Sequence, residues 1–223
     1  KKRLEWRGID CNVEGVSIGD KLEASKYDLF FIGGGQDFEQ GVLLQDLSGE
    51  KTAEIKAAIE DEKVFLAICG GYQILGSYYK TWDGQQCDFL GALDLYTVGQ
   101  KDRMIGNYMY ECDDLGGQTV VGFENHSGQT FLGDGVKPIG KVLSGYGNNG
   151  KDGYEGARYK NVYATYSHGC LLPKNPVALQ DIVEGGTVGQ QEGGIQRAGL
   201  NELHQALPMD GVHAAGLENQ VFP

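Results

Sequence analysis

One cysteine stands where a strand is expected to turn sharply into a helix. The apolar residues 64–68 stop at Cys69, which is followed by Gly70 and Gly71 and then by apolar residues at helical spacing up to Tyr78. This pattern is typical of a nucleophile elbow, in which small neighbours permit a strained turn that exposes the reactive atom. The positive end of the helix dipole would also lower the pKa of the thiol. A buried structural cysteine is the alternative.

Two histidines are candidates for the general base that a cysteine nucleophile needs. His168 follows an expected strand at residues 159–166 and precedes Gly169. A thiol and an imidazole at the ends of adjacent strands are the pair that acyl transfer requires. His126 is the competitor for this role. Taken alone, each of them could equally be a hydrogen-bonded structural histidine.

A glycine triplet follows another expected strand. The apolar residues 29–32 run into this triplet, which contains Gly34 and Gly35. Its spacing does not fit the dinucleotide motif G-x-G-x-x-G, and no helix with an acidic residue about 20 positions on completes such a unit. A glycine loop at the carboxyl end of a parallel strand can present backbone N–H groups toward Cys69. We therefore expect Gly34, Gly35 and Gly70 to form an oxyanion hole, with a flexible turn as the alternative.

The N-terminal part of the chain is expected to alternate strands and helices. Hydrophobic patterns predict a strand within residues 9–18, buried strands at 27–32 and 64–68, and an amphipathic helix at 51–62. Residues 1–7 read as the end of a basic helix that Gly8 caps in a left-handed conformation. Because a strand normally precedes such a helix, we expect a first strand to be missing from this sequence. The alternation favours an α/β fold with a parallel sheet covered on both sides.

After Gly91 the pattern changes to short alternating strands and glycine turns. Strands are expected at residues 93–98, 104–111, 119–123 and 159–166. The intervening segment 145–153 is rich in glycine and asparagine and is predicted to lie on the surface, because it is too polar to pack.

Composition limits the class of protein. With 223 residues, 40% of them hydrophobic, the chain can bury a core as one domain or as one domain with an appendage. Its net charge of −12 argues against nucleic acid or an anionic membrane as the main partner. The five cysteines lack C-x-x-C spacing, so we expect neither a metal site nor a disulfide framework, and a reducing, cytoplasmic setting follows. No apolar run approaches the roughly 18 residues of a transmembrane segment.

Three motifs carry a resemblance to a known family. They occur in the order Ala67-Ile68-Cys69-Gly70-Gly71-Tyr72-Gln73, Gly122-Phe123-Glu124-Asn125-His126 and Tyr166-Ser167-His168-Gly169. Over about residues 1–180 the chain resembles class I, triad-type glutamine amidotransferase domains of the cobyric-acid-synthase-like branch. The resemblance implies a flavodoxin-like α/β three-layer sandwich with a mostly parallel central sheet.

Two further segments, residues 103–107 and 145–150, narrow the resemblance to glutaminase subunits that act in peptidoglycan and cell wall biosynthesis. It implies that the chain hydrolyses L-glutamine and delivers ammonia to a Mur-ligase-like subunit of the MurT type in a heterodimer. That partner would bind ATP and magnesium and amidate D-glutamate of the lipid II stem peptide to D-isoglutamine. No cofactor is expected in this chain.

The resemblance also assigns roles to individual residues. Cys69 would be the nucleophile and His168 the general base. Arg103 would hold the carboxylate of the substrate glutamine, for which its planar fork of donors is well suited. Without the family, Arg103 would read as a solvated surface arginine.

The sequence departs from the family pattern in three places. Cys170 stands where a proline is expected after the His-Gly pair. No acidic residue lies two positions after His168, where many class I enzymes carry an orienting glutamate, and Glu155 is a weak candidate for that task. Residues 181–223 are acidic, rich in glycine and weakly periodic. We predict an amidotransferase domain at 1–180 and a loosely ordered tail or lineage-specific extension beyond it.

Two other functions are compatible with the fold that the resemblance implies. One is an amidotransferase of corrinoid synthesis, for which a fused synthetase domain would be expected. The other is a non-catalytic module that binds a partner. The presence of both Cys69 and His168 speaks against such a module, and a glutaminase assay would discriminate.

Overall fold

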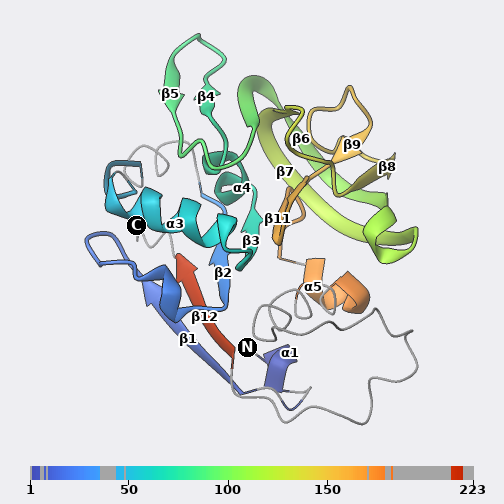
Figure 1. Ribbon diagram of the computed structural model, residues 1–223. Coiled ribbons are helices and arrows are strands. Elements are labelled where there is room, and N and C mark those ends of the chain that lie inside the picture. The colour runs from blue at the N-terminus through green and yellow to red at the C-terminus, as the bar shows by residue number, and fades with distance from the viewer. Residues whose placement is uncertain are drawn as a thin grey trace, which may run out of the picture.

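Two β-sheets with short helices around them make up the described part of the chain (Figure 1). The structure is a computed structural model, and it describes residues 2–5, 8, 10–35, 44–47, 49–169, 171–178, 182 and 212–217.

The first sheet is mostly parallel. Its strands, in spatial order, are β1 (Cys11–Val16), β12 (Val212–Leu217), β2 (Leu29–Ile32), β3 (Val64–Ile68), β11 (Val162–Thr165) and β10 (Ala157–Tyr159). Neighbouring strands are parallel, except that β10 runs antiparallel to β11. Helix α3 (Glu50–Glu60) connects β2 to β3 and covers one face of the sheet (Figure 1). The predicted strand, helix and parallel strand are therefore present, and the α/β class is confirmed.

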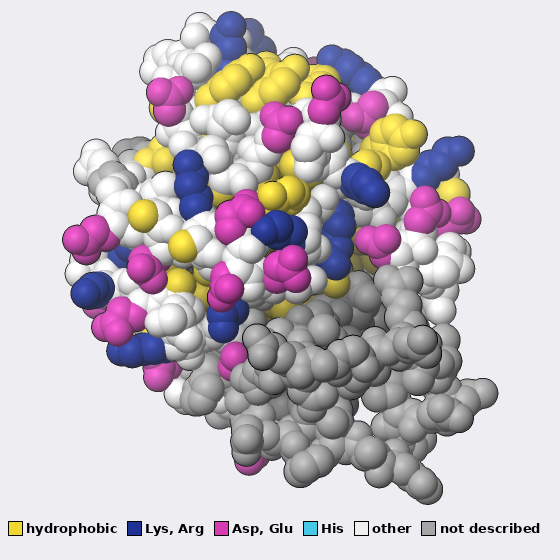
Figure 2. All heavy atoms as spheres, viewed as in Figure 1, with side chains coloured by type: hydrophobic (Ala, Val, Ile, Leu, Met, Phe, Trp, Pro, Cys, Tyr) yellow, Lys and Arg dark blue, Asp and Glu magenta, His cyan; other side chains and the backbone are white. Residues whose placement is uncertain are grey.

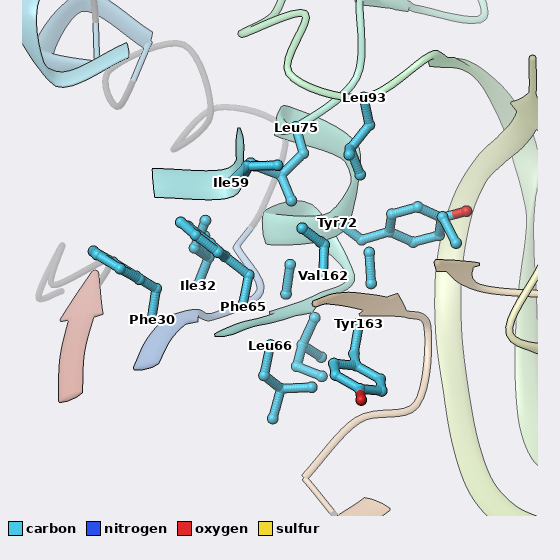
Figure 3. Close-up of a cluster of buried hydrophobic side chains, with 14 of the residues drawn as sticks. Phe30, Ile32, Ile59, Phe65, Leu66, Tyr72, Leu75, Leu93, Val162 and Tyr163 are labelled. Atoms are coloured by element: carbon cyan, nitrogen blue, oxygen red, sulfur yellow. The ribbon is translucent and has the colours of Figure 1, made fainter. Parts of the chain in front are cut away.

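Apolar side chains between α3 and the first sheet form the core of this part. Phe30 and Phe65 stack with ring centroids 4.4 Å apart, and Ile55 and Ile59 of α3 are fully buried against the sheet (Figure 3). Burying each such side chain contributes about 2 kcal/mol. All five residues of β3 are buried, as expected for a parallel strand covered on both faces. This packing fixes the position of the end of β3, where Cys69 follows.

The second sheet is built on a long hairpin (Figure 1). Its strands are β6 (Leu95–Cys112), β7 (Gln118–Leu132), β4 (Tyr78–Lys80), β5 (Gln86–Asp88), β8 (Gly140–Ser144) and β9 (Tyr154–Glu155). The sequence predicted separate strands at 93–98 and 104–111 and a short one at 119–123, and this division is wrong. A register shift between Gly99 and Met104 lets β6 continue through the intervening polar residues as an irregularity within one strand.

Short helices and turns complete the described structure. They are α1 (Lys2–Glu5), α4 (Gly70–Ile74), α5 (Leu171–Lys174) and the 3-10 turns η1 (Ala24–Lys26) and η2 (Asp113–Leu115). The Gly8 amide donates to the Glu5 carbonyl, and Gly8 has a φ of +73°, as predicted for a left-handed cap. No helix among the described residues combines the length and the apolar character needed to cross a bilayer.

Six residues of the C-terminal segment 181–223 belong to the first sheet. Strand β12 pairs in parallel with β1 on one side and with β2 on the other. The flavodoxin-like order places the first strand between the second and the third, and β12 lies at the corresponding place. The expectation of a loosely ordered tail does not hold for these six residues. Apart from Ile182, the rest of the segment lies outside the described residues, and the domain boundary at 180 stays a prediction.

Charged side chains of both signs are interspersed over the face shown in Figure 2. Hydrophobic side chains gather at the top of that view, near the place where Figure 1 draws the β4–β5 hairpin. Rings of three neighbouring strands stack in this sheet, with centroids 5.1 Å apart for Tyr78 and Tyr96 and 5.3 Å apart for Tyr96 and Phe131. These stacks stabilise the pairing of β4, β6 and β7.

Candidate active site

Cys69 lies at the sharp turn between β3 and α4. Its backbone has a φ of +52° and a ψ of −107°, a conformation that side chains beyond glycine rarely adopt. The Cys69 amide donates to the Thr165 carbonyl at 2.9 Å, and the Cys69 carbonyl accepts from the Gln73 amide at 3.0 Å. These bonds tie the cysteine to β11 and to the first turn of α4. The predicted strained elbow is therefore present, although α4 ends at Ile74 and Tyr78 already begins β4.

The packing around this elbow is close and requires a glycine at one position. A Cβ at Gly71 would lie 2.4 Å from the Ile32 carbonyl oxygen, so a side chain there would push α4 away from the end of β2. A Cβ at Gly34 would lie 3.4 Å from the Cβ of Cys69 and 4.0 Å from the Gly70 amide nitrogen. The glycine loop after β2 thus lies against the cysteine. Gly35 is the next residue of that loop, and the described part of the loop ends there.

His168 follows β11, which is the parallel neighbour of β3. Its amide donates to the Phe123 carbonyl of β7 at 2.9 Å. Its Nε2 is buried and has no hydrogen-bond partner among the described residues. A neutral imidazole can accept a proton at the ring nitrogen that carries none.

Partial burial lowers the pKa of His168 below its usual value. The charges of His126 and Arg103 act in the same direction, whereas the nearby backbone of Asn125 acts to raise the pKa. The first of these effects is the largest, so the neutral, proton-accepting form of the ring predominates at neutral pH. This is the form that a general base needs.

His126, the competing histidine, occupies a structural position. It is buried in the middle of β7, where Nδ1 lies 2.7 Å from the Gly128 carbonyl oxygen. Its ring stacks on Tyr166, with centroids 3.5 Å apart and planes at 6°. Its Nε2 lies 3.7 Å from the buried carboxylate of Glu124. His126 therefore lies within a strand, packed on Tyr166, rather than at a strand end.

Arg103 lies in the irregular part of β6, next to β7. Its Nε donates to Oδ1 of Asn125 at 2.9 Å, and its Nη2 donates to the Asn125 carbonyl at 3.3 Å. The charge of Arg103 is close enough to the His168 ring to lower the pKa of that ring. The structure thus brings together Arg103 and His168, which are far apart in sequence.

Glu155, the candidate for the orienting acid, is fully buried and hydrogen-bonds groups other than the His168 ring. Its Oε1 accepts from the Thr165 hydroxyl at 2.6 Å and from the Tyr166 amide at 2.9 Å. Burial raises the pKa of Glu155, which favours its uncharged form. Glu155 supports the strand that leads to His168, but its described hydrogen bonds do not go to the His168 ring. Cys170, the other departure noted in this stretch, lies outside the described residues.

The prediction that segment 145–153 lies on the surface is wrong for its central residues. Asn148 and Asn149 are buried, and the backbone amides of Tyr146 and Gly147 donate to the buried carboxylate of Glu124 at 2.8 and 2.9 Å. These side chains satisfy the polar backbone of the loop, and this is why it can pack. In the sequence, only the two adjacent asparagines between glycines indicated that this loop could pack.

This loop also contacts the helix that follows the cysteine. Tyr72 reaches from α4 toward the second sheet (Figure 3), and its hydroxyl donates to Oδ1 of Asn148 at 3.1 Å. The side chain of Gln73, also in α4, donates to the Tyr166 hydroxyl at 3.0 Å. Sequence reasoning missed this support of the elbow by the second sheet, because it joins residues that are distant in the chain.

An apolar cavity lies away from these residues. Its lining includes Leu66, Tyr110 and Tyr163, and it includes neither Cys69 nor His168. A mainly apolar lining does not suit a charged amino acid. The elbow, the glycine loop and the region around His168 therefore form the candidate active site.

Comparisons with known proteins agree with this arrangement. A family model described as a CobB/CobQ-like glutamine amidotransferase domain matches residues 2–176. Among solved structures, one titled "Structure of PurLQS from Thermotoga maritima" superimposes with a TM-score of 0.57 at 17% identity, over 76% of this chain and 84% of that chain. This likeness shows the class I glutamine amidotransferase fold.

Curated relatives cover most of this chain. It is 45% identical over 175 residues to "Lipid II isoglutaminyl synthase (glutamine-hydrolyzing) subunit GatD" of Staphylococcus aureus, which is 78% of this chain and 70% of that protein. The protein of the same name from Streptococcus pneumoniae is 43% identical over 77% of this chain and 65% of its own length. A "Probable cobyric acid synthase" of Methanothermobacter thermautotrophicus is 33% identical over 72% of this chain but only 33% of its own length. Since the family model spans most of the sequence, the chain belongs to the CobB/CobQ-like glutamine amidotransferase family.

Proposed function

We propose that this chain is the glutaminase subunit of a lipid II isoglutaminyl synthase. It hydrolyses L-glutamine and delivers ammonia to a Mur-ligase-like subunit of the MurT type, which amidates D-glutamate of the lipid II stem peptide. The observation that carries glutamine hydrolysis is the strained Cys69 elbow, with the Gly34 loop against it and His168 at the end of the adjacent strand. The similarity to two GatD subunits supports the lipid II stem peptide as the acceptor of the ammonia.

The positions of these residues suit a thioester mechanism. Neutral His168 takes the proton of the Cys69 thiol, and the thiolate attacks the side-chain amide carbon of glutamine. The resulting tetrahedral oxyanion is stabilised by the backbone N–H groups of Gly34, Gly35 and Gly70. Protonated His168 then gives its proton to the departing ammonia, which leaves a γ-glutamyl thioester. Water, deprotonated by His168, attacks that thioester and releases glutamate and the free thiolate.

The acceptor can be identified with isotope-labelled glutamine. The chain would be produced with a Mur-ligase-like subunit and supplied with amide-¹⁵N glutamine, ATP, magnesium and lipid II. We expect ¹⁵N in the isoglutamine of the product, as measured by mass spectrometry. Labelling of a corrinoid acceptor instead would favour the relationship to cobyric acid synthase. We place ATP and magnesium on the partner and the reaction in the cytoplasm, where ATP is available.

Hydrolysis is expected to depend on the partner. A glutaminase that releases ammonia to solvent wastes substrate, so coupled enzymes complete or order the site when the second subunit binds. We expect the isolated chain to show less than about one tenth of the kcat/KM of the complex. Titrating the partner while measuring glutamate release tests this. Full activity of the isolated chain would instead indicate a free-standing amidase.

Loss of Arg103 is expected to weaken glutamine binding. Arg103→Ala removes a charge-assisted contact to a carboxylate that does not change during the reaction, so KM should rise about 10- to 100-fold with kcat nearly unchanged. Lys101→Ala is the matched control, because Lys101 is a nearby cation on the same strand whose Nζ lies 4.3 Å from the Trp82 ring centroid. A normal KM in Arg103→Ala would indicate that Arg103 is a solvated surface residue that does not bind glutamine.

The acid limb of the pH profile of kcat/KM is expected to have its midpoint below 6.5. That profile reports the pKa values of the free enzyme, and burial lowers the pKa of His168 below 6.5. His168 must be neutral to act as a base, so activity should rise as pH increases through this lowered pKa and should be complete at neutral pH. Steady-state rates of the complex between pH 5 and 9 measure this. A midpoint above 7 would contradict the assignment.

A further inference from the structure

We propose that Asn125 is a positioning residue whose side chain holds Arg103 in a fixed place near His168. The inference rests on the proposed function, because it concerns how the carboxylate end of glutamine is held while its amide end reacts. Asn125 belongs to one of the three motifs that carry the family resemblance.

The outer edge of β7 is the structural basis of this arrangement. Strand β7 pairs with β6 along one edge. Along its other edge, residues two apart bind the segment that carries His168. The Asn175 side chain bonds the amide and carbonyl of Val121, and the Phe123 carbonyl accepts from the His168 amide. Asn125 is the next residue in the same alternation. Because backbone groups of alternate residues point to the same edge of a strand, these contacts form one continuous row.

Asn125 is the member of this row that also reaches Arg103. Its carbonyl accepts from Nη2 of Arg103 at 3.3 Å. Its side-chain oxygen accepts from Nε of Arg103 at 2.9 Å. Arg103 lies just before the point where the register of β6 and β7 resumes, and Ile105 is paired with Asn125. The backbone of β6 alone therefore does not direct the guanidinium, and the Asn125 side chain does.

The side chain of Asn125 thus acts separately from the backbone of β7. That backbone binds the His168 amide through the Phe123 carbonyl and is retained in any substitution at position 125. The side chain orients only Arg103, whose remaining donors are then aimed at the glutamine carboxylate. A change of the Asn125 side chain should therefore alter the binding of glutamine while leaving the base in place.

Asn125→Ala tests this separation in the complex with the partner. We expect KM to rise about 3- to 10-fold, with kcat changed by less than about 3-fold and the acid limb of the pH profile unmoved. Gln129→Ala is the matched control. Gln129 lies on the same face of β7, four residues on, and its Oε1 accepts from Nζ of Lys151 at 3.0 Å, so this variant also removes a bond between an amide and a cation. We expect Gln129→Ala to leave KM within about 2-fold of the parent value.

A double-mutant cycle shows whether Asn125 acts through Arg103. In an Arg103→Ala background, Asn125→Ala should change KM by less than about 2-fold, because there is no guanidinium left to orient. Glutamine binding to the Cys69→Ala protein, measured by calorimetry, repeats the cycle without turnover. A general loss of folding would lower thermal stability and affect kcat as well as KM.

Each outcome bears on one of the two claims. If Arg103→Ala weakens glutamine binding but Asn125→Ala does not, the role of Asn125 is overturned while the proposed function stands. Equal effects of Asn125→Ala with and without Arg103 would also overturn it, because Asn125 would then act independently. If the complex binds glutamine with the expected pattern but never hydrolyses it, the positioning role stands and the glutaminase assignment fails. If Arg103→Ala leaves binding unchanged, Arg103 has no role for Asn125 to support, and the positioning claim falls.

Discussion

Replacing Cys69 by alanine is expected to abolish glutamine hydrolysis and to leave the fold intact. Without a thiolate no γ-glutamyl thioester can form, and we expect kcat to fall by at least about 10⁴-fold. The change removes a single sulfur atom from a side chain that is already small, so the free energy of unfolding should fall by only about 1 kcal/mol. The midpoint of thermal unfolding should therefore shift by only a few degrees. Measuring glutamate release and thermal unfolding of the same samples tests both parts.

Labelling with a glutamine-like diazo-ketone should show whether the reactive cysteine is the one at the active site or simply the most exposed one. Cys69 is 9% exposed and counts as buried, whereas Cys87 on β5 is exposed. A reagent shaped like the substrate should nevertheless modify Cys69 alone, because binding places its electrophile beside this thiol. Cys87→Ala is the control and should not change the labelling. Modification at Cys112 or Cys170 in place of Cys69 would show that the active site lies at that cysteine instead.

Loss of His168 is expected to be nearly as damaging as loss of the nucleophile. His168→Ala removes the group that protonates the departing ammonia and activates water, so kcat should fall by at least about 10³-fold. Glu155 provides the comparison, because it was the candidate for a third catalytic group. The isosteric change Glu155→Gln should lower kcat by less than about 10-fold, since the described hydrogen bonds of Glu155 go to Thr165 and Tyr166 and not to the His168 ring.

Glutamine is a better replacement than alanine for this comparison. Alanine at position 155 would leave the Thr165 hydroxyl and the Tyr166 amide without their buried partner and would destabilise the strand before His168. Glutamine retains an acceptor and the volume of the side chain. Any remote Asp or Glu of this chain whose loss costs as much as loss of His168 would refute a dyad of Cys69 and His168.

Local sequence patterns were sufficient for the parts of the site that short segments build. The run of five apolar residues before Cys69 and the glycines after it predicted a buried strand and a strained turn, and both are present. These features depend on steric limits and hydrophobic periodicity within about a dozen residues, which the sequence displays directly. The parallel unit of β2, α3 and β3 follows from the same kind of pattern.

Contacts between distant residues decided the rest. The choice between His126 and His168 depends on which ring lies inside β7 and which lies at a strand end, and both histidines had plausible sequence surroundings. The bonds from Tyr72 to Asn148 and from Arg103 to Asn125 join residues 76 and 22 positions apart. The register shift in β6 and the insertion of β12 between β1 and β2 likewise depend on strand pairing. No local pattern encodes such pairings, because their energy arises only when the sheets assemble and bury these polar groups together.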